Sequence, residues 1–382
     1  MKIPKAIEIP PVDLTRQYRL ISEEATASVL AILNSGRYIG GDAVISFEKQ
    51  FAEYIGTKEC VGCNSGTDAL YMALKALDIG AGDEVITTPF TFVATAEVIT
   101  RVGATPIFVD IDLDTFNLDL LQVAKAISPQ TKAIVPVHLF GQPVNMTELM
   151  AIAEKRELYV IEDCAQATGA EWNGKKIGGI GHIGCFSFFP TKNLGACGDA
   201  GALTTNDSEI ALKVKMLREH GCEVRYRHDV TGINSRLDAI QAAILKIKLR
   251  YLDEWNEQRN IAAANYQKLL NPIRQIKLPA GISGGTSTWN QYTICLQKPK
   301  TNASQRDRLR EKLRDAGIIS MIYYPLPLHL QPVYQNLGYK KGQLPVAEQA
   351  AREVLSLPMF PGILPEEQQQ VAYALKDCLE KI

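Results

Sequence analysis

The chain has 382 residues, of which 46% are hydrophobic and 22% are charged. This length suffices for two domains or one large α/β unit, and the composition is ordinary for a soluble globular protein. A formal net charge of −1 gives no overall electrostatic reason to bind nucleic acid or an anionic membrane.

The N-terminus carries no apolar signal core, and no stretch approaches membrane-spanning length, which predicts a cytoplasmic protein. In a chain of this length without a signal peptide, the eight cysteines are expected to be free thiols. Cys60 and Cys63 form one closely spaced pair. No second pair follows at zinc spacing, so we expect no metal site.

Helices are predicted over residues 14–56, around a glycine-rich turn at 35–41. Strand-like runs then alternate with helical segments, which indicates an α/β fold with a largely parallel sheet covered by helices on both faces. In such sheets, ligands bind at the carboxyl ends of the strands. The predicted strands lie near residues 59–63, 83–88, 105–110, 132–138, 158–163, 183–189 and 200–205.

One long amphipathic helix is predicted from Arg236 to about Leu270, linking a large domain to a smaller one. The Gly- and Ser-rich piece at 281–287 is predicted to be a loop, because a strand-like segment follows at 290–295. We therefore predict a large α/β domain at residues 1–245 and a small α+β domain at residues 246–382.

Lys192 stands just past the predicted strand at 183–189, in a loop rich in glycine. A lysine that is partly desolvated there has a lowered pKa and can attack a carbonyl, although an ordinary surface lysine in a turn is the alternative. Upstream, Asp163 ends another predicted strand. A pyridoxal phosphate enzyme needs this pair, because the lysine holds the cofactor as a Schiff base and the aspartate keeps the pyridine nitrogen protonated.

At this point the sequence resembles the DegT-type (DegT/DnrJ/StrS) nucleotide-sugar aminotransferases of fold type I, which depend on pyridoxal 5′-phosphate. The resemblance implies a mostly parallel seven-stranded sheet sandwiched by helices, with a smaller α+β C-terminal domain. It covers nearly the whole chain in the family's order. The segments that carry it are residues 64–70, 88–95, 162–166, 187–192, 232–238 and 324–329.

The resemblance assigns most of the cofactor site. Gly66 and Thr67 open a predicted helix whose N–H groups suit a phosphate, although a simple capped helix start is the alternative. The hydroxyl matching Ser187 joins that phosphate in the family. Phe92 matches the aromatic that stacks on the pyridine ring, with a core phenylalanine as the alternative. Gln166 matches the amide that binds the ring hydroxyl.

Asn234 matches an asparagine that the partner subunit contributes to the same phosphate, which implies a homodimer with shared active sites. Arg225 and Arg236 resemble residues directed at the nucleotide diphosphate, where two negative phosphates favour basic groups. A solvated basic loop is the alternative for them. Tyr324 and His329 match positions near the sugar.

We assign no catalytic role to two further ionisable residues, Glu162 and His138. Glu162 precedes Asp163 directly, so strand alternation turns it to the opposite face. His138 lies in a buried-looking run and is expected to be a packed core histidine.

The resemblance implies transfer of an amino group from L-glutamate to a ketosugar in bacterial amino-sugar or surface polysaccharide biosynthesis. Lys192 would move the proton as general base and then acid. The pattern is most similar to enzymes acting on 3-keto sugars linked to UDP or dTDP. Thr168 departs from some relatives, which carry histidine there, and leaves the sugar and nucleotide open. Alternatives are C4 amination, a free ketocyclitol as substrate, or a catalytically silent regulatory relative.

Overall fold

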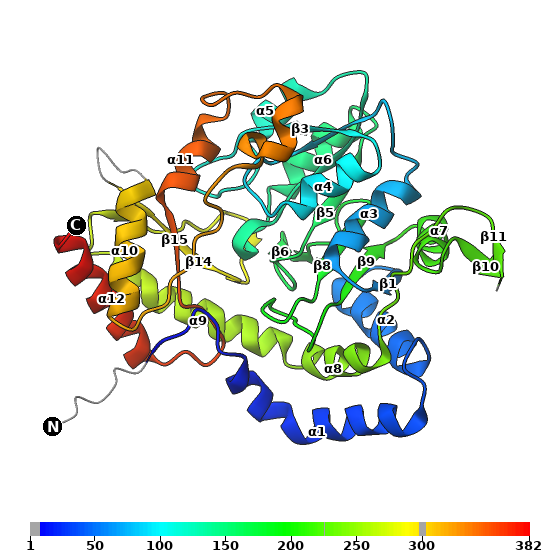
Figure 1. Cartoon of the computed structure of the whole chain (residues 1–382), viewed down its shortest axis with the longest axis horizontal. Helices are drawn as coiled ribbons and strands as arrows, with labels where there is room; N and C mark the ends of the chain where they lie inside the picture. The colour runs from blue at the N-terminus through cyan, green and yellow to red at the C-terminus, as the bar shows by residue number, and fades with distance from the viewer. Residues whose placement is uncertain (1–7, 225, 298–302) are drawn as a thin grey trace.

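Seven strands form the central sheet, in the order β1–β9–β8–β5–β4–β2–β3 (Figure 1). The computed structural model describes residues 8–224, 226–297 and 303–382. All seven predicted strands are present. Their bounds are β1 Glu59–Cys63, β2 Glu84–Thr87, β3 Thr105–Phe108, β4 Thr131–Val135, β5 Tyr159–Asp163, β8 Ile183–Ser187 and β9 Gly201–Thr205.

The sheet is mostly parallel, as predicted. Strands β3, β2, β4, β5 and β8 run in one direction. Strand β9 runs antiparallel to both of its neighbours, β8 and β1. An antiparallel neighbour needs no crossover helix, so the connection from β8 to β9 is a single loop over residues 188–200.

Helices cover both faces of this sheet because successive strand residues point to opposite sides. Cys185 packs on the face covered by α3 (Gly66–Ala76), α4 (Ala94–Arg101) and α7 (Ser208–Arg218). Phe186 packs on the other face, together with α2 (Asp42–Ile55) and α8 (Ala239–Leu249). Farther along that face lie α5 (Leu120–Ala126) and α6 (Met146–Glu154).

The C-terminal part has its own core around a smaller antiparallel sheet in the order β12–β14–β15. Helices α9, α10 and α12 pack against it. Helix α11 follows a loop that returns toward the large sheet. The bounds are β12 Ile276–Lys277, β14 Tyr292–Leu296, β15 Val354–Leu357, α9 Leu252–Leu270, α10 Ala303–Asp315, α11 Pro345–Glu353 and α12 Pro365–Glu380.

The prediction of one helix from Arg236 to Leu270 is wrong, because α8 and α9 are separate helices. The backbone tightens at the junction, where the N–H of Tyr251 donates to the carbonyl of Lys248 over 3.0 Å. The Tyr251 ring stacks on Trp255 with 5.7 Å between centroids. The predicted domain boundary at residues 245/246 falls within α8 and stays a prediction.

Helix α1 (Leu14–Ser35) packs on α8 at the rim of the molecule (Figure 1). A short hairpin of β10 (Cys222–Val224) and β11 (Arg227–His228) follows α7 and projects from the body. Among the described residues, no helix has both the length and the apolar character needed to span a membrane.

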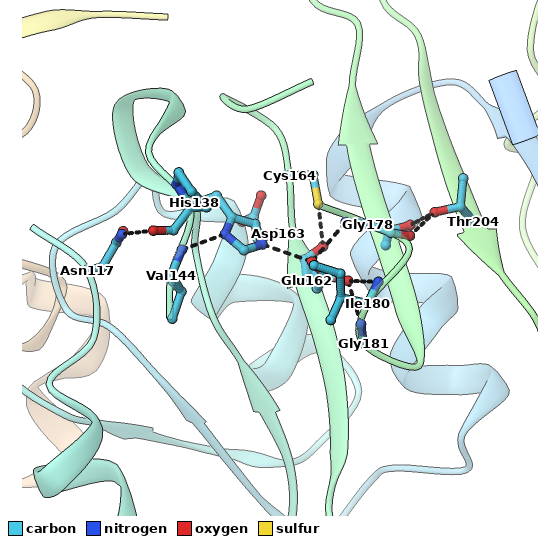
Figure 2. A network of polar contacts seen from close by, with 12 residues as sticks. Asn117, His138, Val144, Glu162, Asp163, Cys164, Gly178, Ile180, Gly181 and Thr204 are labelled. Carbon is cyan, nitrogen blue, oxygen red and sulfur yellow. Dashed lines mark hydrogen bonds and ion pairs between the residues drawn. The ribbon is translucent and has the colours of Figure 1, made fainter. Parts of the chain in front are cut away.

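Glu162 of β5 is buried and joins the segment after β4 to the loop before β8 (Figure 2). Its carboxylate accepts hydrogen bonds from the backbone N–H groups of Gly178, Ile180 and Gly181 over 2.8, 3.0 and 2.6 Å. His138 Nε2 lies 3.1 Å away on the other side. Four N–H donors thus solvate a fully buried carboxylate and fix the loop before β8.

His138 has the structural role that the sequence predicted. The N–H of Val144 donates to His138 Nδ1 over 3.0 Å, so Nδ1 carries no proton and Nε2 is the nitrogen that donates to Glu162. Cys164 lies close enough to these two side chains for all three to share an ion. The hydrogen bonds already use the carboxylate and Nδ1 lone pairs, so the geometry favours a structural network over a metal site.

Gly178 must be glycine for two reasons, and a matched pair of substitutions separates them. Its φ is +82°, and a Cβ there would lie 2.2 Å from Phe186 Cζ. Gly174 has a similar φ of +75° with nothing within 4 Å of its Cβ position. Both alanine variants carry the left-handed penalty, about 1–2 kcal/mol. Gly178→Ala adds steric overlap, about 1–3 kcal/mol more.

We therefore expect Gly178→Ala to lower the free energy of unfolding more than Gly174→Ala does. Urea unfolding at one fixed protein concentration measures the difference. Equal losses in the two variants would show that the contact with Phe186 relaxes without cost.

Candidate active site

Asp163 and Lys192 meet at the carboxyl ends of two paired strands. Asp163 is the last residue of β5, and Lys192 lies in the loop that follows β8. The two strands are parallel neighbours, with Asp163 opposite Cys185. The topology therefore brings together the two side chains that the sequence singled out.

The Asp163 carboxylate is buried, with 5% of the residue exposed. Thr95 Oγ1 donates to it over 2.8 Å, and the N–H of Ala165 donates over 3.1 Å. Burial raises the pKa of Asp163, while these hydrogen bonds and the charge of Lys192 oppose the rise. The carboxylate is thus held in one orientation, and a cation placed against it would stabilise its charged form.

Lys192 is half-buried at the surface of the site. Burial lowers the pKa of its amine to about 8, although the Asp163 carboxylate favours the ammonium and offsets part of the shift. The neutral, nucleophilic amine is therefore far more populated near neutral pH than in an ordinary lysine, whose pKa is 10.5. The sequence-based alternative, an ordinary surface lysine, does not describe this environment.

Gln166 and Tyr324 line the same space. Gln166 Oε1 accepts the N–H of Phe140 over 2.7 Å, and Nε2 donates to the Tyr324 hydroxyl over 3.0 Å. These bonds fix which end of the amide is the donor. Burial raises the pKa of Tyr324, and the nearby Asp163 charge raises it further, so the phenol stays protonated.

Phe92 offers an open aromatic face beside this pair. The residue is 57% exposed, and its ring centroid lies 6.4 Å from that of Tyr324. A core phenylalanine, the alternative considered from the sequence, would be covered. An exposed ring of this kind can stack on a flat ligand.

The start of α3 lies against the end of β8. A Cβ on Gly66 would come within 2.7 Å of Ser187 Cβ, so glycine permits this close approach. Ser65 caps the helix, with its Oγ accepting the Asp68 N–H over 3.1 Å. Gly66, Thr67 and Ser187 therefore gather at one helix N-terminus, where free N–H groups favour an anion.

The segment that contains Asn234 and Arg236 lies beside the end of β1. Asn234 is exposed, while its neighbour Ser235 donates to Asn64 Oδ1 over 3.0 Å. Arg236 pairs with Glu219 at 3.2 Å. Arg225 lies outside the described residues.

His329 is buried, with Nε2 lying 3.3 Å from Glu348 Oε1. Its ring packs against Tyr339 with 6.0 Å between centroids. Thr168, the position that differs from some relatives, is also buried. The predicted contact of His329 with a sugar stays a prediction.

Thr95 is a site residue that the sequence analysis did not identify. It lies in one of the resembling segments, but a threonine near the start of a helix has many ordinary uses. Only the packing of α4 against the end of β5 reveals its bond to Asp163.

Comparison of the sequence with known protein families supports the interpretation of this site. The DegT/DnrJ/EryC1/StrS aminotransferase family matches residues 19–376. The chain belongs to this family. It is an aminotransferase, and the family and fold predicted from the sequence are confirmed.

Relatives of this aminotransferase match it along nearly its whole length. A pleiotropic regulatory protein of Geobacillus stearothermophilus is 49% identical, covering 96% of this chain and 97% of that protein. A UDP-N-acetyl-3-dehydro-α-D-glucosamine 3-aminotransferase of Acidithiobacillus ferrooxidans is 44% identical, covering 97% and 98%. The crystal structure of S. venezuelae DesV with a ketimine intermediate is 40% identical, with a TM-score of 0.94, covering 98% and 100%.

The lowered pKa of Lys192 predicts a distinct reactivity profile. We expect its acetylation by acetic anhydride, measured by mass spectrometry on full-length protein freed of carbonyl compounds with hydroxylamine, to level off above about pH 8. Below that pH the rate should fall about tenfold per unit, because only the neutral amine reacts. The exposed Lys268 of α9 supplies the reference curve. A Lys192 curve that matches the reference curve would contradict the buried environment.

Proposed function

We propose that this aminotransferase transfers an amino group from L-glutamate to the 3-keto position of a nucleotide-linked sugar, with pyridoxal 5′-phosphate as cofactor. The observation that carries the proposal is the Lys192 amine, with its pKa lowered to about 8, next to the buried Asp163 carboxylate. The name of the A. ferrooxidans relative supports a UDP-linked acceptor. A dTDP-linked acceptor is the alternative.

The described residues fit this cofactor. Its phosphate would lie at the start of α3, where Gly66, Thr67 and Ser187 gather. Phe92 would stack on the ring with its open face. When bound, pyridoxal phosphate supplies an electron sink that stabilises the negative charge left on a carbon after its proton is removed.

Asp163 would hold a proton on the pyridine nitrogen. Thr95 and the N–H of Ala165 keep its carboxylate aimed at one place. A buried carboxylate without a cation is costly, so a protonated ring nitrogen would relieve that cost.

Lys192 would act as both base and acid. Its Nζ takes the proton from the α-carbon of the amino donor, and in the second half of the cycle it delivers a proton to the sugar carbon. An amine with a pKa near 8 suits both directions, because neither protonation state is strongly favoured near neutral pH.

Gln166 would bind the ring hydroxyl. Its Nε2 has two N–H groups, and one of them donates to Tyr324. The second remains for an acceptor in the site. Tyr324 would thereby set the orientation of Gln166 while lying near the sugar.

A homodimer with shared sites is part of the proposal. Large apolar side chains are exposed along α1 and the start of α2, a surface that a second copy would cover. They are Tyr18, Leu20, Leu30, Leu33, Tyr38, Ile39 and Ile45. The exposed Asn234 would reach the partner's phosphate, and Arg225 and Arg236 would approach the nucleotide diphosphate.

The name of the G. stearothermophilus relative supports a second candidate, a regulatory protein of the same fold. The two differ in one respect: regulation without turnover does not require Lys192. Amination at C4 and a ketocyclitol substrate would use the same machinery, so substrate profiling must decide between them.

Replacing Lys192 tests the enzymatic proposal. We expect Lys192→Ala to lose the visible absorption of the cofactor adduct and to lower product formation from a 3-ketosugar nucleotide by at least about 10³-fold, since general acid–base and covalent roles are both removed. Lys268→Ala, an exposed lysine on α9, is the matched control. Retention of full biological function by Lys192→Ala would favour the regulatory candidate.

Hybrid dimers test whether Asn234 acts across the interface. Subunits carrying Lys192→Ala and subunits carrying Asn234→Ala are each expected to be weakly active alone. In a hybrid of the two, one site has both lesions and the other has none. Random mixing should therefore restore about one quarter of the wild-type activity. Failure of the mixture to recover activity would place Asn234 in its own subunit's site, and a fully active monomer on sedimentation would exclude sharing altogether.

A further inference from the structure

Three buried asparagines meet next to the loop that carries Lys192. Asn193 follows Lys192 directly, Asn256 lies in α9, and Asn290 precedes β14. They are 3%, 7% and 4% exposed. We call these three residues the amide cluster.

The amide cluster and the nearby backbone use both N–H groups and the oxygen of the Asn193 side chain. Its Nδ2 donates to Asn256 Oδ1 over 2.7 Å and to the carbonyl of Thr288 over 2.8 Å. Asn290 Nδ2 donates to Asn193 Oδ1 over 2.7 Å. The orientation is unambiguous, because Asn256 Nδ2 donates to the carbonyl of Thr168 over 3.1 Å and so leaves Oδ1 as its acceptor.

Backbone and side-chain bonds together hold the Lys192 loop, and the Lys192 N–H donates to the carbonyl of Phe189 over 2.9 Å within it. Backbone hydrogen bonds join its ends, where the Phe188 N–H donates to Ala200 and the Ala196 N–H donates to Phe188, each over 2.8 Å. Between these points the loop lies outside any strand or helix. Two buried side-chain contacts join this stretch to other elements: the amide cluster at Asn193, and Lys248, whose Nζ donates to the carbonyl of Gly195 over 2.7 Å.

We infer that Asn193 is a positioning residue, which fixes the loop to α9 and to the segment before β14 and thereby holds the Lys192 amine beside Asp163. Its importance for catalysis depends on the function proposed above for Lys192. Losing the tether would leave buried amide groups unpaired and let water reach the lysine. A hydrated amine behaves more like an ordinary lysine, whose pKa is 10.5.

The inference links two distant parts of the chain. Asn256 and Asn290 belong to the C-terminal part, whereas Lys192 and Asp163 belong to the large sheet. The reactivity of the lysine therefore depends on how α9 and the residues before β14 dock against the loop. A purely structural role for the amide cluster would affect stability and leave the lysine unchanged.

The test is the pH dependence of Lys192 acetylation in the full-length protein freed of carbonyl compounds. We expect Asn193→Ala to move the inflection upward by about one pH unit or more, because desolvation of the amine is relieved. Asn290→Ala removes one of the three bonds and should produce a smaller shift in the same direction. Tyr266→Phe is the control, because it removes a buried hydrogen bond to the carbonyl of Pro358 within the C-terminal core.

Each outcome decides the inference. An inflection near pH 8 in a folded Asn193→Ala protein would overturn it, as would an equal shift in Tyr266→Phe. If Asn193→Ala does not fold, Asn290→Ala decides on the same criterion. The labelling does not depend on turnover, so a shift in Asn193→Ala together with full activity of Lys192→Ala would uphold the positioning role and reject the proposed function.

Discussion

The parallel pairing of β5 with β8 is the constraint on which the site depends. It places the last residue of one strand and the loop after the next strand in the same space, with Asp163 opposite Cys185 in the register. Burial acts on both side chains there in opposite directions, raising the pKa of the acid and lowering that of the lysine. Neither group could have these properties at an exposed edge of the sheet.

The adjacent acidic residues at the end of β5 point to opposite faces of the strand. Asp163 faces the site, while Glu162 turns into the core and is satisfied by four N–H donors. The Glu162 bonds hold the loop that leads into β8, the strand from which Lys192 follows. A carboxylate that holds the core and one that faces the site therefore stand next to each other because a strand alternates its side chains.

Local patterns in the sequence predicted all seven strands of the large sheet, together with the meeting of Asp163 and Lys192, since strand ends in α/β sheets converge. Contacts between segments that are distant in the sequence could not be predicted from such local patterns. The bond from Thr95 to Asp163 and the amide cluster involve common polar residues, whose partners lie 63 to 97 positions away. The break between α8 and α9 was missed because apolar periodicity continues across Arg250 and Tyr251 and contains no glycine or proline.

The antiparallel strand β9 also sets the order in which a nascent chain can complete the site. Strand β1, which leads into the helix start at Gly66, is hydrogen-bonded to β9 and is separated by it from β8. The helix start at Gly66 is made early on the ribosome, yet the strand before it has no ladder partner until residues 201–205 emerge. Because β9 also closes the loop that carries Lys192, one short strand fixes the helix start at Gly66 and the base of that loop at the same moment of synthesis, before Asn256, Asn290 and Tyr324 are made.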